Sequence, residues 1–127
     1  MKTILIIGAN SNIGSYLAHQ FFEEKHSLIL HTHRNNQRIQ SLLSQDNISH
    51  LQFDVCDYHN ITKTFSNLFE NKQMIPDSVI ITSAERSKDF RKVAETDISL
   101  SEKIIKTNLT GTYYLLKTII PYLRQKE

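Results

Sequence analysis

The sequence of 127 residues contains one cysteine, Cys56, and no tryptophan. A single cysteine cannot form a disulfide within the chain or build a cysteine-based zinc site, so stabilisation through sulfur is excluded and we predict no metal site. Proline and glycine are also scarce, with 2 and 3 residues. Their scarcity excludes long flexible linkers and indicates that the secondary structure elements are joined compactly.

Neither sign of charge dominates the sequence, which has 15 Lys and Arg, 13 Asp and Glu, and a formal net charge of +2. The basic residues are scattered among acidic ones, so the charge pattern of a nucleic-acid-binding protein is missing. The apolar run before Gly8 is too short for a signal peptide or a membrane span. We therefore expect a cytoplasmic protein without a membrane or nucleic-acid partner, and a small or phosphorylated ligand.

Apolar segments with many β-branched residues alternate along the chain with amphipathic segments. The length and the 39% hydrophobic content predict one domain over residues 1–127. The predicted strands cover residues 3–7, 27–32, 50–53 and 79–82. Helices are predicted from residue 13, over 36–43 and 61–69, and at the end of the chain, where Ser99 and Glu102 have capping-box spacing; residues 85–96 are predicted as a surface loop. This alternation predicts a parallel sheet with helices on both faces.

The segment IIGANSNIGSYLA joins the first predicted strand to the first predicted helix. Gly8 permits a sharp turn, and Gly14 permits close approach of the helix to the strand or to a phosphate. Asn10, Ser11 and Asn12 can donate hydrogen bonds to phosphate, and Asn12 can take the place of a glycine because asparagine tolerates a left-handed backbone. The helix N-terminus would add free N–H groups. The alternative is an ordinary strand-to-helix loop with Ser11 or Asn12 as its N-cap.

Three further motifs follow in order: DVCD at 54–57, TSAE at 82–85 and NLTGT at 108–112. Gly8, Asn12, Ile13 and Gly14 occupy the positions of a Gly-x-x-x-Gly-x-Gly turn, with Asn12 at the middle glycine. Together these motifs resemble the short-chain dehydrogenase/reductase family over almost the whole chain. The resemblance implies a three-layer, Rossmann-like, doubly wound α/β fold. It further implies about four strands in the order 3-2-1-4, forming a single NAD(P)-binding domain that is incomplete relative to the family.

The same resemblance implies roles for individual residues. Asp54 and Val55 would contact the adenine, Asn108 would be the catalytic asparagine, and the Glu85 carboxylate would lie near the nicotinamide ribose and the phosphates. Taken together with the residue chemistry of the turn and of the second strand end, the candidate cofactor-binding residues are Gly8, Asn10, Ser11, Asn12, Ile13, Gly14, His33, Arg34, Asp54, Val55, Ser83 and Ala84. Two alternatives stay open: Asp54 is a turn cap, or Asn108 is an ordinary helical residue, although its apolar neighbours predict a buried amide.

The end of the second predicted strand carries no carboxylate. An acidic residue at this point typically binds the ribose hydroxyls of NAD, whereas a basic residue accommodates the extra phosphate of NADP. Here the strand is followed by His33 and Arg34, and the next acidic residue is Asp46. Arg34 offers a forked donor for phosphate and His33 a second contact, which predicts that NADP(H) is preferred over NAD(H). The alternative is a solvated Arg34, with His31 and His33 alternating along a strand edge.

The resemblance also implies an activity, hydride transfer between a nicotinamide and a carbonyl or alcohol of a small-molecule substrate. The family's Ser, Tyr and Lys follow the helix that bears Asn108, so we expect them to be absent from this truncated chain, which ends at Glu127 and alone would be inactive. Tyr113 and Lys117 satisfy Tyr-x-x-x-Lys on one helix face. They lie on the helix of Asn108 itself, however, whereas the family's pair lies on a separate helix. We therefore predict that Tyr113 packs or snorkels and that Lys117 is solvated. The alternatives are a non-catalytic dinucleotide-sensing or regulatory module and an inactive remnant.

A fold of this size leaves surfaces uncovered. The fourth strand would be a free sheet edge, and the apolar face of the last helix would lack a partner. These surfaces predict a homo-oligomer formed through the fourth-strand edge or the last helix; the alternative is association with a complementing chain.

Overall fold

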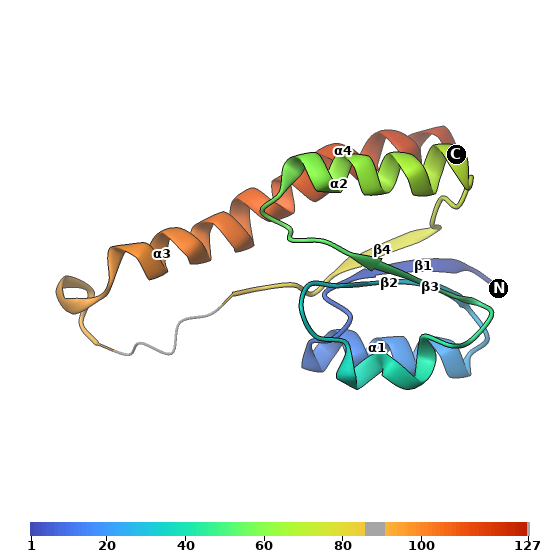
Figure 1. Cartoon of the computed structure of the whole chain (residues 1–127), viewed down its shortest axis with the longest axis horizontal. Helices are drawn as coiled ribbons and strands as arrows, with labels where there is room; N and C mark the ends of the chain where they lie inside the picture. The colour runs from blue at the N-terminus through green and yellow to red at the C-terminus, as the bar shows by residue number, and fades with distance from the viewer. Residues whose placement is uncertain (86–90, 127) are drawn as a thin grey trace.

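The computed structural model describes residues 1–85 and 91–126 and contains one parallel sheet of four strands in the order β3-β2-β1-β4 (Figure 1). The strands are β1 (Thr3–Ile7), β2 (Ser27–Thr32), β3 (Ile48–Gln52) and β4 (Ser78–Ile81). β1 pairs with β2 on one side and with β4 on the other. The predicted α/β fold and its strand order are confirmed.

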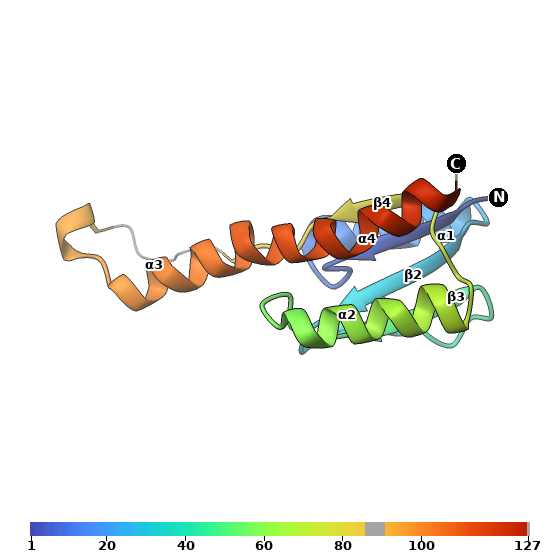
Figure 2. The same cartoon turned by 90° about the horizontal axis from the view of Figure 1, so that it is seen from above.

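Helices cover both faces of the sheet and complete a three-layer architecture (Figure 1). One face carries α1 (Asn12–Glu23) and the 3-10 helix η1 (Gln37–Leu42), and the other carries α2 (Tyr58–Ser66) and α4 (Thr112–Lys126). The remaining elements are the π turn η2 (Asn67–Asn71), the 3-10 turn η3 (Val93–Glu95), α3 (Ile98–Ile105) and the π turn η4 (Lys106–Gly111). Figure 2 shows that α3 and η4 continue the line of α4 and project beyond the sheet.

None of the helices in the described part of the chain has both the length and the apolar character needed to cross a bilayer.

Alternating side chains of β1 build the two halves of the core. Ile4 and Ile6 pack in the cluster beneath α1 and η1, and Leu5 and Ile7 pack in the cluster beneath α2 and α4. All four side chains are buried. Burial on both faces explains why this strand is an uninterrupted apolar run rather than an alternating one.

Some predicted boundaries differ from the structure. β3 begins two residues before the predicted start at residue 50, and the predicted helix over 36–43 is the 3-10 helix η1. The N-cap of α3 is Asp97, not Ser99, because the Asp97 carboxylate accepts hydrogen bonds from the N–H and the hydroxyl of Ser99, at 3.0 Å and 2.8 Å. Part of the predicted loop over 85–96 lies outside the described residues.

Candidate functional site

A cleft of about 500 Å³ opens at the C-terminal edge of the sheet. Its walls come from the turn after β1, the ends of the other strands, and α3 with η4. The lining residues are Gly8, Asn10, Ser11, His31, Thr32, His33, Arg34, Asn35, Asp54, Val55, Cys56, Ser83, Ala84, Glu85, Lys103, Lys106 and Thr107. Ligands of open α/β sheets bind at this edge, because the helix that follows β1 directs its N-terminus there.

The turn between β1 and α1 depends on both of its glycines. Gly8 has a φ of +82°, and a Cβ atom there would lie 2.6 Å from the backbone nitrogen of Ser83. A Cβ atom on Gly14 would overlap the carbonyl oxygen of Gly8 and lie 2.7 Å from Thr82 Oγ1. Gly8 therefore provides the turn, and Gly14 allows the close approach of α1 to β1.

The middle position of the turn does not need a glycine. Asn12 is the first residue of α1, and among the described residues other than glycine a positive φ occurs at Lys25 and Gln73. The prediction that Asn12 replaces a glycine through a left-handed backbone is therefore wrong. The N-cap is Ser11, whose side-chain oxygen accepts a hydrogen bond from the N–H of Gly14 at 2.9 Å.

Thr82, at the end of β4, ties the turn to the sheet. Its hydroxyl hydrogen is shared between the carbonyl oxygens of Ile7 and Gly8, at 2.9 Å and 3.0 Å. The hydroxyl of Ser11 donates to Thr82 Oγ1 at 3.2 Å. Thr82 was predicted as the last residue of the fourth strand and directly follows β4 in the structure. Its contact with Ser11, 71 positions away, depends on the pairing of β1 with β4.

His31, at the end of β2, is the buried titratable side chain of the cleft, with 2% of its surface exposed. Its Nδ1 accepts a hydrogen bond from the N–H of Gly8 at 3.1 Å, and its Nε2 lies 2.8 Å from the carbonyl oxygen of Phe53. Burial lowers the pKa of His31 to about 4, and the hydrogen bond to Phe53 opposes that shift. His31 is therefore neutral at pH 7. For His31, the alternative of a side chain that merely alternates along a strand edge is wrong.

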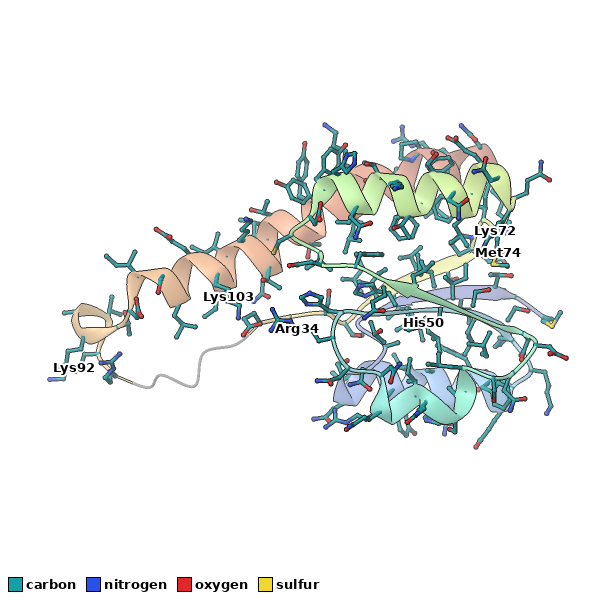
Figure 3. The ribbon with its side chains drawn as sticks, in the orientation of Figure 1. Arg34, His50, Lys72, Met74, Lys92 and Lys103 are labelled. Atoms are coloured by element: carbon teal, nitrogen blue, oxygen red, sulfur yellow. The ribbon has the colours of Figure 1, made fainter. Side chains whose placement is uncertain are left out.

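His33, Arg34 and Asp54 line one end of the cleft. The Nε2 atom of His33 lies 3.8 Å from Asp54 Oδ2, while Asp54 Oδ1 accepts a hydrogen bond from the N–H of Cys56 at 2.9 Å. One carboxylate oxygen of Asp54 thus caps its turn and the other faces the cleft. Figure 3 shows Arg34 at the sheet edge, on the same side as Lys103 of α3, and both side chains line the cleft.

Glu85 lines the cleft, and Asn108, which is not a lining residue, holds its backbone. The Asn108 side-chain oxygen accepts from the Glu85 N–H at 2.7 Å, and its NH₂ donates to the Glu85 carbonyl at 2.7 Å. The Glu85 carboxylate lies 3.6 Å from Lys103 Nζ. The predicted burial of the Asn108 amide is wrong: the residue is exposed because η4 projects beyond the sheet, and the amide finds its partners in the Glu85 backbone.

The structure brings most of the predicted cofactor-binding residues to the cleft, but not all of them. Asn12, Ile13 and Gly14 do not line it, and the Ile13 side chain points to solvent with 67% exposure. Conversely, sequence reasoning missed His31, Lys103 and Lys106 as lining residues. A histidine in an otherwise apolar buried strand was the available signal for His31. Lys103 of α3 and Lys106, the first residue of η4, are three residues apart and offered no signal of their own.

The Tyr-x-x-x-Lys pair lies away from the cleft. Tyr113 is 57% exposed and is not among the lining residues. The Nζ atom of Lys117 lies 5.9 Å from the centroid of the Tyr113 ring. The two side chains pair with each other on the surface of α4 and do not face the site.

The arrangement of β1, its glycine turn, the strand order and the cleft corresponds to a known family. A model of that family, described as short chain dehydrogenase, matches residues 2–127. The chain belongs to the short-chain dehydrogenase family. Four parallel strands in this order, with helices on both faces, are also found in solved short-chain dehydrogenases.

Individual relatives agree with this assignment. An uncharacterized oxidoreductase of Staphylococcus epidermidis is 26% identical over 128 residues, covering 99% of this chain and 54% of that protein. An NADP-dependent 3-hydroxy acid dehydrogenase, YdfG of Salmonella typhi, is 25% identical over 98% of this chain and 50% of its own length. The chain therefore spans about half the length of the curated short-chain dehydrogenases that it matches.

Solved structures show the same correspondence. The structure of ElxO with NADP bound has a TM-score of 0.81 and 26% identity, covering 99% of this chain and 52% of that one. A short-chain dehydrogenase from Leptospira borgpetersenii with bound NAD+ has a TM-score of 0.86 and 22% identity, covering 98% of this chain and 47% of that one. The second likeness concerns the fold alone.

Proposed function

We propose that this chain binds a nicotinamide dinucleotide in the cleft at the C-terminal edge of the sheet, with NADP(H) preferred over NAD(H). In this proposal it is the cofactor-binding part of an oxidoreductase. The bound cofactor would supply hydride transfer to or from a carbonyl or alcohol. The observation that carries the proposal is the convergence of Gly8, of Ser11, the N-cap of α1, and of Arg34 on one cleft.

The residues of the cleft fit a ligand that bears phosphates. Cationic side chains of Arg34, Lys103 and Lys106 line it together with the carboxylates of Asp54 and Glu85. Lys103 pairs with Glu85, so the acidic side chain at this position is balanced by a cation. The first N–H groups of α1 have no acceptors within the helix and carry the positive end of its dipole. Phosphate oxygens would supply those acceptors.

The preference for NADP(H) rests on Arg34. In the described residues, none of the hydrogen bonds or ion pairs given by the structure involves its guanidinium, which leaves the forked donor available to a phosphate. Asp54 is the carboxylate nearest to this end of the cleft, and one of its oxygens already accepts from Cys56. The NADP-dependent relative and the NADP-bound ElxO structure are consistent with this preference.

Titration with NADPH and with NADH, followed by nicotinamide fluorescence, tests the proposal. We expect saturable binding of both and tighter binding of NADPH. Replacing Arg34 with Ala should weaken NADPH binding roughly tenfold or more and NADH binding much less, because charge-assisted hydrogen bonds to the extra phosphate are lost.

Arg124→Ala is the matched control, because Arg124 is an exposed arginine of α4 that does not line the cleft. It should leave both affinities unchanged. Equal weakening of NADPH and NADH by Arg34→Ala would contradict the NADP preference and point to Asp54 as a ribose partner. No saturable binding at millimolar concentrations of either dinucleotide would contradict the proposed function.

Asn108 is proposed to act within this site through the Glu85 backbone. Its side chain clamps both backbone groups of Glu85 and so holds the segment that follows β4 against η4. In the proposed enzyme it takes the position of the family's catalytic asparagine. The alternative, a dinucleotide-sensing module without chemistry, would show the same binding but no hydride transfer to a panel of ketones.

We further propose that two copies of the chain associate through the last helix. Exposed apolar side chains form one stripe at helical spacing along α3, η4 and α4: Ile98, Ile105, Leu109, Tyr113, Leu116 and Ile120. A second copy offers the same stripe, and a formal net charge of only +2 gives little repulsion between copies. In the described part of the chain, β4 pairs only with β1, so its outer edge is free as well.

Light scattering over a range of concentrations tests the association. The wild type should give the mass of a dimer or larger, and Leu109→Glu should lower it to that of a monomer, because a charge would be buried in the stripe. Val93→Glu is the matched control, since Val93 is 90% exposed and lies in η3, off the stripe. A monodisperse wild-type monomer at high concentration would contradict the proposal.

A further inference from the structure

The turn after β1 uses several of its N–H groups internally before any ligand arrives. The N–H of Ala9 donates to the carbonyl oxygen of His31 at 2.8 Å, and the N–H of Gly8 donates to the ring of the same residue at 3.1 Å. The N–H of Ser11 donates to the Gly8 carbonyl at 3.1 Å, and that of Gly14 donates to the Ser11 side chain. The position of Gly8 therefore decides where α1 begins and where its remaining N–H groups point.

The two partners of the His31 ring fix which nitrogen carries the proton. A backbone N–H can only donate, so Nδ1, which faces Gly8, must be unprotonated. A carbonyl oxygen can only accept, so Nε2, which faces Phe53, must carry the hydrogen. A doubly protonated ring would direct an N–H at the N–H of Gly8. The site therefore accommodates one tautomer of the neutral imidazole.

The same ring links the two sides of the cleft. Phe53 directly precedes Asp54 and Val55, which line the adenine side in the proposed function, and its ring lies against that of His31 with centroids 4.0 Å apart. Gly8 and Ser11 line the cleft on the side that the proposed function gives to the phosphates. His31 thus joins the end of β3 to the turn after β1 across the end of β2. It is buried beneath both.

We propose that His31 is a positioning residue for dinucleotide binding. Its neutral ring, protonated at Nε2, accepts the hydrogen bond of the Gly8 N–H and thereby fixes the conformation of the turn that presents the start of α1 to the phosphates. The proposal rests on the proposed function for the dinucleotide, but its structural part concerns the free protein. Nδ1, as an acceptor, positions the turn at Gly8 on the phosphate side of the cleft. Nε2, as a donor, positions Phe53 and the Asp54 that follows it on the other side.

Two substitutions separate these contacts. In His31→Asn the side-chain oxygen can take the place of Nδ1, which keeps the contact to Gly8 and loses the one to Phe53. In His31→Gln the amide nitrogen can reach the place of Nε2, which keeps the contact to Phe53 and loses the one to Gly8. We expect His31→Gln to weaken NADPH binding about tenfold and His31→Asn to weaken it about threefold or less. A purely structural role would move both affinities together.

Nuclear magnetic resonance of the free protein tests the proposal independently of binding. The long-range ¹H–¹⁵N spectrum of the wild-type His31 ring should show Nδ1 unprotonated and Nε2 protonated, and Gly8 with the first amides of α1 should shift in His31→Gln but not in His31→Asn. The opposite tautomer, or equal shifts in both variants, would overturn the proposal. Absence of dinucleotide binding by the wild type would contradict the proposed function. The ring spectrum and the amide shifts would still show whether His31 positions the turn in the free protein.

Discussion

Replacing Gly14 with Ala is expected to abolish dinucleotide binding and to lower the free energy of unfolding by about 3 kcal/mol. Helix propensity alone favours alanine over glycine by about 1 kcal/mol, so the sign depends on the tertiary contacts. A Cβ atom here would overlap the Gly8 carbonyl and approach Thr82 Oγ1 to 2.7 Å and Ser11 Oγ to 2.9 Å. The carbonyl belongs to the backbone and cannot rotate away. The clash therefore outweighs the gain in propensity, and α1 must move off the turn.

Urea unfolding followed by circular dichroism measures the loss, and NADPH titration measures the effect on binding. Gly111→Ala is the matched control, because its Cβ atom would lie 3.0 Å from a Val55 methyl group, which can shift, and 3.1 Å from the Val55 carbonyl oxygen. We expect that control to cost about 1 kcal/mol or less and to leave the turn intact. If Gly14→Ala were no more destabilising than Gly111→Ala, the proposed packing of α1 on the turn would be wrong.

The fold should lose stability as the pH falls from 6.5 to 4, by up to roughly 3 kcal/mol from His31 alone. The pKa of His31 is lowered from 6.5 to about 4, chiefly by burial, so in this range the unfolded chain binds a proton that the folded protein does not. Stability is therefore complete above the unfolded pKa and declines as the pH drops toward the folded one. Charge on His33 and on His50 lowers the pKa of His31 further, whereas the charge on Asp54 raises it.

Unfolding free energies at several pH values between 7 and 4 test this dependence, with His31→Asn as the comparison. The free energy of unfolding of the variant should fall less over this pH range. Its remaining decrease should include the contribution of His50, whose pKa is also lowered by desolvation. The exposed carboxylates of Glu70 and Asp77 have lowered pKa values as well, from hydrogen bonds to Tyr122 and to Lys126, so their contribution falls away at still lower pH. Parallel curves for the two proteins would exclude His31 as the titrating group.

The order of elements was predictable because each depends on a pattern within a short segment. The run from Thr3 to Ile7 is apolar without alternation, which is typical of a strand buried on both faces, and the structure has β1 there. The boundaries of β3 and the cap of α3 were not predicted correctly. A single side-chain hydrogen bond, such as that of Asp97, decides where a helix begins. Asp and Ser are similarly good N-cap residues, so the sequence did not distinguish Asp97 from Ser99.

The candidate site was predictable to the extent that it lies in motifs at strand ends. Gly8, Arg34, Asp54 and Ala84 each follow a predicted strand, and parallel strands bring their C-terminal ends to one edge, where all four line the cleft. The prediction for Asn12 failed for a local reason. α1 begins at Asn12, one residue before the predicted start at residue 13, so the backbone of Asn12 is helical and a side chain is tolerated there.

The sequence by itself determined that this chain is an α/β protein of parallel strands with a glycine turn after the first one, because periodicity and turn chemistry act over a few residues. Only the tertiary structure decided the proton position on His31, the pairing of Glu85 with Lys103 and the clamp that Asn108 makes on the Glu85 backbone. These contacts join residues that are distant in the sequence. They exist because the strand order and the projection of α3 bring particular atoms within hydrogen-bonding or ion-pairing distance.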